Sequence, residues 1–202
     1  MKKKELEIIL QKIPAFDSPS FTLEQYLTPA GIAADIIFTA HQNGDIEDKV
    51  VFDLGCGTGI FAIGAILTGA KKVVGFDIDK KSVEIAKKYA EKNNLKVEFL
   101  VKDVLDIKVR CDTIIMNPPF GAQKSNLKAD RKFIEKGFNI SSVIYSLHLK
   151  KTVPFIEKMI LALEGEITYY KNYIFKIKHT YNFHEKKTVD YDVSLLRILT
   201  KR

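Results

Sequence analysis

Short apolar runs and amphipathic runs alternate along the chain from residue 49 onward. The apolar runs have the length and residue types of buried strands, over Val50–Leu54, Val73–Phe76, Val97–Val101, Thr113–Met116 and Ser142–Leu147. Helical periodicity lies between them, over Ile60–Leu67, Lys81–Asn93, Ala129–Asn139 and Thr152–Leu163. Strands that alternate with helices predict an α/β fold, in which a parallel sheet is covered by helices on both faces.

Both ends of the chain depart from this alternation. Near the start, apolar residues recur at helical spacing with charges between them, at Leu6, Ile9, Leu10 and Ile13. Near the end, Glu166–Ile177 and Thr188–Leu199 look like strands with no helical pattern between them. We therefore expect one domain over residues 1–202: a helical extension over residues 1–48, then a core over residues 49–202 whose sheet ends in an antiparallel hairpin.

Composition places the chain among globular proteins, with 46% hydrophobic and 28% charged residues. The longest apolar stretch, Gly59–Ala70, is too short to span a bilayer and is interrupted by polar and glycine residues. Lysines 2 to 4 are followed by an amphipathic pattern rather than by the continuous apolar run of a signal peptide. These features favour a cytoplasmic protein.

Cysteine spacing and net charge limit the kinds of ligand and partner that we expect this protein to bind. The two cysteines, Cys56 and Cys111, have no partner at zinc-ligand spacing, and the four histidines are scattered, so we expect neither a metal site nor a disulfide framework. The net charge of +7 favours a polyanionic partner, because lysines and arginines that neutralise phosphates release counterions. Charge alone is also compatible with a protein that binds no nucleic acid.

A glycine-rich loop follows the first strand, in the sequence Asp53-Leu54-Gly55-Cys56-Gly57-Thr58-Gly59. Its spacing is Gly-x-Gly-x-Gly, whereas dinucleotide-binding loops carry Gly-x-Gly-x-x-Gly. The carboxylate of Asp53 would repel a pyrophosphate but attract a ligand with an ammonium group and a sulfonium. The loop therefore favours S-adenosylmethionine over a dinucleotide.

Two more carboxylates follow the next two strands. Asp77 ends the second strand, where it can accept hydrogen bonds from ribose hydroxyls, and Asp103 follows the third, where it can accept from an adenine amine. Each alone would be read as a helix cap or a turn residue. At successive strand ends behind a glycine loop, they indicate a cofactor that contains adenosine.

The fourth strand ends in Asn117-Pro118-Pro119-Phe120. Prolines lack amide donors, so this turn offers carbonyl oxygens, and the side chain of Asn117 adds another acceptor. Two acceptors can hold the hydrogens of an amine on a planar ring and orient its lone pair toward a methyl donor. Phe120 offers an apolar face on which a base can stack. The tetrapeptide predicts methyl transfer to an exocyclic amine.

Several motifs together resemble the methyltransferase-like-five family of small-subunit ribosomal RNA adenine-N6 methyltransferases. They cover most of residues 20 to 200 and comprise Leu23–Pro29, Asp53–Gly59, Gly75–Asp79, Met116–Gly121, Tyr145–His148 and Tyr181–Arg197. The resemblance implies the class I S-adenosylmethionine-dependent methyltransferase fold, Rossmann-like, with a mostly parallel seven-stranded sheet and an antiparallel C-terminal hairpin. It also implies ribosomal RNA as substrate and a small zinc-containing partner of the Trm112 type.

The resemblance assigns roles to individual residues. The catalytic residues would be Asn117, Pro118, Pro119 and Phe120. The cofactor-binding residues would be Gln25, Tyr26, Thr28, Asp53, Gly55, Cys56, Gly57, Thr58, Gly59, Asp77, Ile78, Asp103, Val104 and Asn117. The resemblance places near the RNA His148, Phe183, His184, Lys186 and Lys187. Lys124 and Lys128 lie in the polar stretch after the tetrapeptide, and from their charge and position we expect them to bind RNA phosphates. Two positions depart from the family: Leu27 stands where Pro is more frequent, and Thr58 replaces another small residue.

Other functions are compatible with parts of this pattern. The same tetrapeptide can hold the N2 amine of guanine in RNA. Protein glutamine methylation fits less well, because those enzymes generally carry Tyr at position 120 and a larger helical domain ahead of the fold. A DNA enzyme would need an added recognition segment, and a silent RNA-binding scaffold would not need the intact tetrapeptide.

Two expectations concern the surroundings of the protein. The third strand, Val97–Val101, should lie at an edge of the sheet, where unpaired backbone groups would receive the partner by strand addition. The lysine- and isoleucine-rich composition favours an archaeal source.

Overall fold

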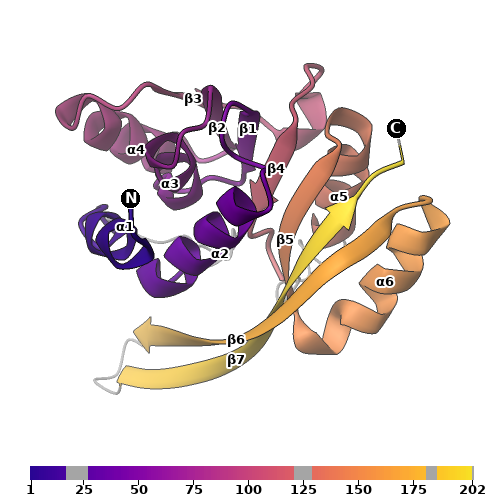
Figure 1. The fold of residues 1–202 in the computed structure, drawn as a ribbon. Coiled ribbons are helices and arrows are strands. Elements are labelled where there is room, and N and C mark those ends of the chain that lie inside the picture. The colour runs from indigo at the N-terminus through magenta and orange to yellow at the C-terminus, as the bar shows by residue number, and fades with distance from the viewer. Residues whose placement is uncertain (17–26, 121–128, 181–185, 202) are drawn as a thin grey trace.

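The computed structural model describes residues 1–16, 27–120, 129–180 and 186–201. The strands in these residues form a seven-stranded sheet of order β3-β2-β1-β4-β5-β7-β6 (Figure 1). Their bounds are β1 Val50–Leu54, β2 Lys72–Asp77, β3 Val97–Val101, β4 Thr113–Met116, β5 Val143–Leu149, β6 Glu166–Thr180 and β7 Lys186–Leu199. The predicted sheet is confirmed, including the position of β3 at one edge.

The parallel strands place the first and fourth strand ends side by side. β1 pairs with β2 on one side and with β4 on the other, so the strand order reverses between β1 and β4. In the register of β1 and β4, Leu54 lies opposite Met116. The loop that follows Leu54 and the turn that follows Met116 therefore leave the sheet together, at the reversal point where open α/β sheets bind their ligands.

The C-terminal strands form the predicted antiparallel hairpin. β7 pairs with both β5 and β6, and its pairing with β5 runs from Val143 opposite Leu199 to Leu149 opposite Val193. β6 and β7 stay paired as far as Thr180 opposite Lys186, well past the end of β5. Figure 1 shows this distal part of the hairpin reaching out beyond the rest of the sheet.

Helices cover the two faces of the sheet unequally. Apolar residues of α1 to α4 pack in one core cluster with Val51 and Ile115, while residues of α5 and α6 pack in the other with Phe52 and Ile114. The helices are α1 Lys3–Leu10, α2 Ala30–Gln42, α3 Ile60–Leu67, α4 Lys80–Lys92, α5 Ala129–Ile140 and α6 Val153–Ala162, with short 3₁₀ turns η1 Val104–Asp106 and η3 Lys150–Thr152. Predicted bounds agree to within a few residues; α2 had been anticipated only as part of the helical extension.

The second face of β1, β2 and β3 carries a groove. Between β3 and β4 the chain forms the short turn η1 instead of a full helix. A groove of about 800 Å³ lies beside this turn, with Phe52, Val74, Phe76 and Leu100 among its lining residues. Apolar side chains at the edge strand and after it are exposed, at Val101, Leu105 and Val109. None of the helices in the described part of the chain is long and apolar enough to cross a membrane.

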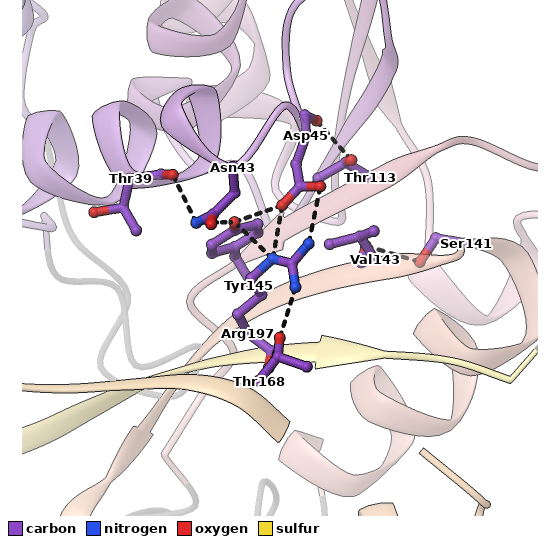
Figure 2. Close-up of polar contacts among 9 residues, drawn as sticks. All are labelled: Thr39, Asn43, Asp45, Thr113, Ser141, Val143, Tyr145, Thr168 and Arg197. Carbon is purple, nitrogen blue, oxygen red and sulfur yellow. Dashed lines mark hydrogen bonds and ion pairs between the residues drawn. The ribbon is translucent and has the colours of Figure 1, made fainter. Parts of the chain in front are cut away.

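A buried polar cluster joins the region before β1 to the C-terminal strands (Figure 2). The Arg197 guanidinium donates to both carboxylate oxygens of Asp45, at 2.8 and 3.1 Å, and to the Thr168 hydroxyl at 2.6 Å. The Tyr145 hydroxyl donates to Asp45 at 2.6 Å, and the Thr113 hydroxyl donates to the Asp45 carbonyl at 2.7 Å. Because Thr113 begins β4, this cluster lies at the end of the sheet opposite the ligand-binding end.

Candidate active site

The glycine loop is shaped by tight contacts on both sides. Gly59 has a φ of 89°, and a Cβ at this position would lie 2.7 Å from the ring of Phe99. Gly57 has a φ of 51°, and a Cβ there would lie 3.1 Å from the ring of Phe16. The positive φ favours glycine at both positions, the ring of Phe99 leaves no room for a Cβ at Gly59, and the ring of Phe16 leaves little room for one at Gly57. Phe16 was not anticipated as a neighbour of this loop, because its position in the sequence carries no loop or strand signal.

Asp53 is the most perturbed carboxylate of the site. It is 1% exposed, its Oδ2 accepts from the amide of Ala62 at 2.9 Å, and its Oδ1 has no hydrogen-bond partner among the described residues. Burial, together with the negative charge of Asp77, raises the pKa of Asp53 to about 8. A ligand that brings positive charge to Oδ1 would satisfy this atom and favour ionisation. The ammonium group of S-adenosylmethionine has the required chemistry.

Two neighbours in the loop differ in what they can offer a ligand. The hydroxyl of Thr58 is buried and has no hydrogen-bond partner in the described part of the structure, so it adds a second polar atom that a ligand could satisfy. Cys56 is 5% exposed and belongs to the core under the loop, where burial raises the pKa of its thiol. Only the backbone of Cys56 would then be available to a ligand, and the same holds for Gly55, against which the ring of Phe133 packs.

Asp77 both holds the loop and remains able to bind a ligand. Its two oxygens accept from the amides of Gly57 at 2.7 Å and Asp79 at 2.9 Å, and burial raises its pKa. A carboxylate has about four acceptor positions, so two hydrogen bonds leave room for ribose hydroxyls. The next residue, Ile78, is 61% exposed and offers an apolar surface at the same strand end.

The third carboxylate, Asp103, is exposed just beyond β3. Its Oδ1 accepts from the amide of Leu105 at 2.9 Å and caps η1, in which Val104 is buried. Asp103 therefore caps η1, in addition to its predicted role of accepting a hydrogen bond from the adenine amine of the cofactor. The structure brings the ends of β1, β2 and β3 together as predicted, and the donor set fits S-adenosylmethionine; the contacts themselves remain predictions.

Asn117 stands directly after β4, beside the glycine loop. Its Nδ2 donates to the hydroxyl of Thr28 at 3.1 Å, while its Oδ1 is buried without a hydrogen-bond partner among the described residues. A buried acceptor without a donor is unfavourable by about 1–3 kcal/mol, which is the kind of defect that a bound donor corrects. The next residue, Pro118, is buried and has no amide proton. An exocyclic amine carries two N–H donors, which would suit Asn117 Oδ1 and the carbonyl oxygen of Pro118.

The ring of Phe120 is supported from the C-terminal hairpin. Its centroid lies 6.5 Å from that of Phe175 on β6, with the two planes at 56°. Phe175 is fully buried, and both rings belong to the cluster that includes Leu149 at the end of β5. Sequence reasoning missed Phe175, because only the sheet order brings β6 next to the catalytic turn.

His148 is part of a buried polar row rather than of the surface. It is 1% exposed, its Nε2 lies 2.8 Å from the Ser146 hydroxyl, and burial lowers its pKa to about 3. In the sheet register it lies opposite Ser194, which donates to Asn172 at 2.8 Å. A serine and a histidine at this distance could suggest a nucleophile, but neither has surface for a substrate. Direct RNA contact by His148 is not available in this structure, and proximity to RNA stays a prediction.

Basic residues lie near the carboxyl end of β5. Lys150 and Lys151 follow this strand directly and are exposed. On the neighbouring helices, the Arg131 guanidinium lies 4.0 Å from the ring centroid of Phe155. Lys150 and Lys151 were not among the predicted site residues, although their position after a predicted strand could have indicated them.

Some predicted residues cannot be placed. The side chains of Lys186 and Lys187 are not described, although both residues begin β7. Other predicted residues lie outside the described ranges: Gln25, Tyr26, Lys124, Lys128, Phe183 and His184.

Comparison with known proteins agrees with the fold and the site. Residues 33–140 match the model of the methyltransferase small domain. Over 98% of both chains, this protein is 37% identical to the rRNA N(6)-adenosine-methyltransferase METTL5 of Danio rerio. It is 40% identical to an uncharacterized protein of Methanocaldococcus jannaschii, over 98% of this chain and 94% of that protein. A proposed RNA methyltransferase of Pyrococcus horikoshii is similar over 100% of this chain and 99% of its own, with 38% identity and a TM-score of 0.91.

The fold is that of a class I S-adenosylmethionine-dependent methyltransferase. With full-length relatives above 30% identity, the chain belongs to the METTL5-like methyltransferase family, as its motifs had indicated. Membership of this family implies S-adenosylmethionine as the methyl donor.

Proposed function

We propose that this methyltransferase modifies the N6 amine of an adenosine in small-subunit ribosomal RNA. The observation that carries the proposal is the buried Oδ1 of Asn117, which has no hydrogen-bond partner in the described part of the chain and lies at the end of β4 beside the glycine loop. The names of the METTL5 relatives in Danio rerio and Drosophila melanogaster support adenosine N6 in rRNA as the target. The motifs Asn117–Phe120 and Tyr145–His148 support the small subunit through the family resemblance.

The cofactor would be held by the residues at the ends of the first three strands. Asp53 and Thr58 offer the ammonium group oxygens that have no partner among the described residues. Asp77 offers its remaining acceptor positions for the ribose, and Asp103 one carboxylate oxygen for the adenine. When bound, S-adenosylmethionine supplies a methyl group that a weak nucleophile can accept. The protein residues then have to position the acceptor amine.

Positioning of the amine falls to the turn after β4. Asn117 Oδ1 and the carbonyl of Pro118 would accept the two amine hydrogens, which directs the nitrogen lone pair out of the hydrogen-bonding plane. Phe120, supported by Phe175, would stack on the base and exclude water. The amine loses a proton to solvent as the new bond forms, so this chemistry depends on orientation more than on a strong base.

Methyl transfer from labelled S-adenosylmethionine to small-subunit ribosomal RNA tests the proposal, with nucleosides identified after digestion. We expect N6-methyladenosine from the wild type and none from Asn117→Ala, while ligand-dependent stabilisation by the cofactor persists in both. Label in N2-methylguanosine would change the proposed acceptor from adenosine to guanosine and would leave the proposed role of Asn117 unchanged. Label on protein glutamine, or no label with the zinc-containing partner present, would overturn the proposal.

We also infer a partner at the β3 edge of the sheet, as the family resemblance implies. Three observations support it: β3 pairs with β2 alone among the strands of the described residues, Val101 and Val109 are 50% and 60% exposed, and a groove lined by apolar and charged side chains lies on the adjoining face. A small zinc-containing protein of the Trm112 type would add a strand to β3 and cover the exposed apolar side chains.

Co-purification with a recombinant Trm112-type protein tests this interface. Val101→Asp should abolish the complex without unfolding the methyltransferase, because this side chain is half exposed in the free chain. Leu161→Asp provides the matched control, since Leu161 is 75% exposed on α6, away from the β3 edge, and should leave the complex intact. A complex that tolerates Val101→Asp and loses affinity with Leu161→Asp would refute this placement.

A further inference from the structure

The side-chain amide of Asn117 has two polar ends with opposite hydrogen-bonding roles. The Oδ1 end accepts and the Nδ2 end donates, and a half-turn of the amide exchanges their positions. An exocyclic amine that approaches this residue is itself a donor. Asn117 can therefore hold the amine only when Oδ1 faces it, and something in the protein has to select that orientation.

In the structure the amide has this orientation, with Nδ2 toward the hydroxyl of Thr28. This hydroxyl accepts a hydrogen bond from Asn117 Nδ2 at 3.1 Å and is the only hydrogen-bond partner of the Asn117 side chain within the described residues. Thr28 is 5% exposed, so water has little access to compete for either group. With Nδ2 engaged by Thr28, Oδ1 is left as the open acceptor.

The position of this hydroxyl is fixed by the helix that follows it. Pro29, at the N-cap of α2, accepts with its carbonyl from the amides of Ile32 and Ala33, both at 2.9 Å. Ala33 and Ile36 on the buried face of α2 have no exposed surface. Thr28 is thus attached to a helix packed on the core, which makes its oxygen a rigid reference point 89 residues away from Asn117 in the chain.

We propose that Thr28 is a positioning residue that fixes the amide orientation of Asn117 for the acceptor amine. This proposal rests on the proposed methyl transfer to an exocyclic amine, but it holds for any such amine, whether on adenine, guanine or glutamine. It gives Thr28 a role beyond the cofactor contact that the family resemblance implies. The residue acts through Asn117 and not on the methyl group.

Two substitutions separate the hydroxyl from the shape of the side chain. Thr28→Val keeps the volume and removes the acceptor, whereas Thr28→Ser keeps the hydroxyl and removes a methyl group. For Thr28→Val we expect kcat on the acceptor to fall on the order of tenfold, the equivalent of one net hydrogen bond. We expect the melting temperature to stay close to wild type, the dissociation constant of S-adenosylmethionine to change by a smaller factor than kcat, and Thr28→Ser to restore most of kcat.

The side-chain amide signals of Asn117 in nitrogen-15 NMR spectra give a readout that needs no methyl acceptor. These signals should shift in Thr28→Val and return toward the wild-type positions in Thr28→Ser. Unchanged amide signals in Thr28→Val would overturn the positioning role, whatever the substrate is. A Thr28→Val variant with unchanged kcat and weaker S-adenosylmethionine binding would also overturn it and make Thr28 a cofactor contact alone. Failure of the wild type to methylate RNA would refute the proposed function and leave the amide signals to decide the role of Thr28.

Discussion

Replacement of Asp45 by alanine would remove the acceptor at the centre of the polar cluster in Figure 2. The side chains of Asp45 and Arg197 are 9% and 15% exposed, so solvent can replace little of what the substitution removes. The guanidinium would keep the hydroxyls of Thr168 and Tyr145, and the Tyr145 hydroxyl would lose the acceptor to which it donates. A largely buried positive charge would then lose its counter-charge, and a buried O–H donor would lose its acceptor.

The expected cost follows from this geometry. Removal of one member of a buried ion pair destabilises a protein by about 3–5 kcal/mol, and the partial exposure of Arg197 places this case near ~3 kcal/mol. For a domain of this size, a loss of ~3 kcal/mol lowers the melting temperature by roughly 6–12 °C. Methyl transfer well below the transition should be retained, because the cluster lies at the end of the sheet opposite Asn117.

Urea unfolding at neutral pH measures the effect, with the slope compared between variants to confirm that the unfolding transition is the same. Glu84→Ala is the matched control: Glu84 pairs with Lys80 at 3.8 Å on the exposed face of α4, and its loss should change stability by less than ~0.5 kcal/mol. Adding Arg197→Leu to Asp45→Ala should recover part of the loss, since it removes the unpaired charge. An Asp45→Ala variant as stable as Glu84→Ala, or a double variant with no recovery, would refute the reasoning.

Three further outcomes are expected. Because the pKa of Asp53 is raised to about 8, the native state binds an extra proton between pH ~4 and ~8, and stability falls as pH rises through that window. Asp53→Asn should therefore stabilise the ligand-free protein at pH 8 and not at pH 4. A difference in melting temperature between the two proteins that stays the same from pH 4 to pH 8 would contradict this. Gly75→Ala places a Cβ 2.6 Å from the ring of Phe99 and should cost about 1–3 kcal/mol in thermal unfolding, part of which Phe99→Leu should restore. Neutralising Lys150 and Lys151 with glutamine should weaken RNA binding and reduce the slope of log affinity against log salt by about 1–2, whereas an unchanged slope would remove them from the RNA surface.

The parts of the fold that the sequence predicts are those with a local signal. The strands that start at Val50, Val97 and Thr113 have the expected bounds, because each is a short apolar run that ends in a turn. The loop at Asp53–Gly59 and the turn at Asn117–Phe120 were predicted as site segments for the same reason: the residue types that the expected chemistry requires are adjacent in the chain.

The contacts that sequence reasoning missed join distant segments. Phe175 supports Phe120, and Thr28 holds Asn117, through neighbours that exist only once the sheet order is known. His148 shows a different limit: the family motif implies proximity to RNA, but it could not reveal that the residue is buried, since its strand lies in the interior of the sheet. Alternation along a strand shows that one face is buried but not what covers that face.

The position of β7 inside the sheet has a consequence for how the protein is made. β7 follows β6 in the chain but lies between β5 and β6, so within the residues that the structure describes β6 pairs with β7 alone. While a ribosome is still adding residues 186–199, β5 ends in an open edge and β6 has nothing to pair with. Phe175, which supports the predicted catalytic turn, lies on β6. The strands β1 to β3, whose ends carry the predicted cofactor residues, can therefore pair early in synthesis, whereas the support of Phe120 by Phe175 forms only after β7 has been synthesised. Until then the sheet has an unpaired edge that is open to aggregation.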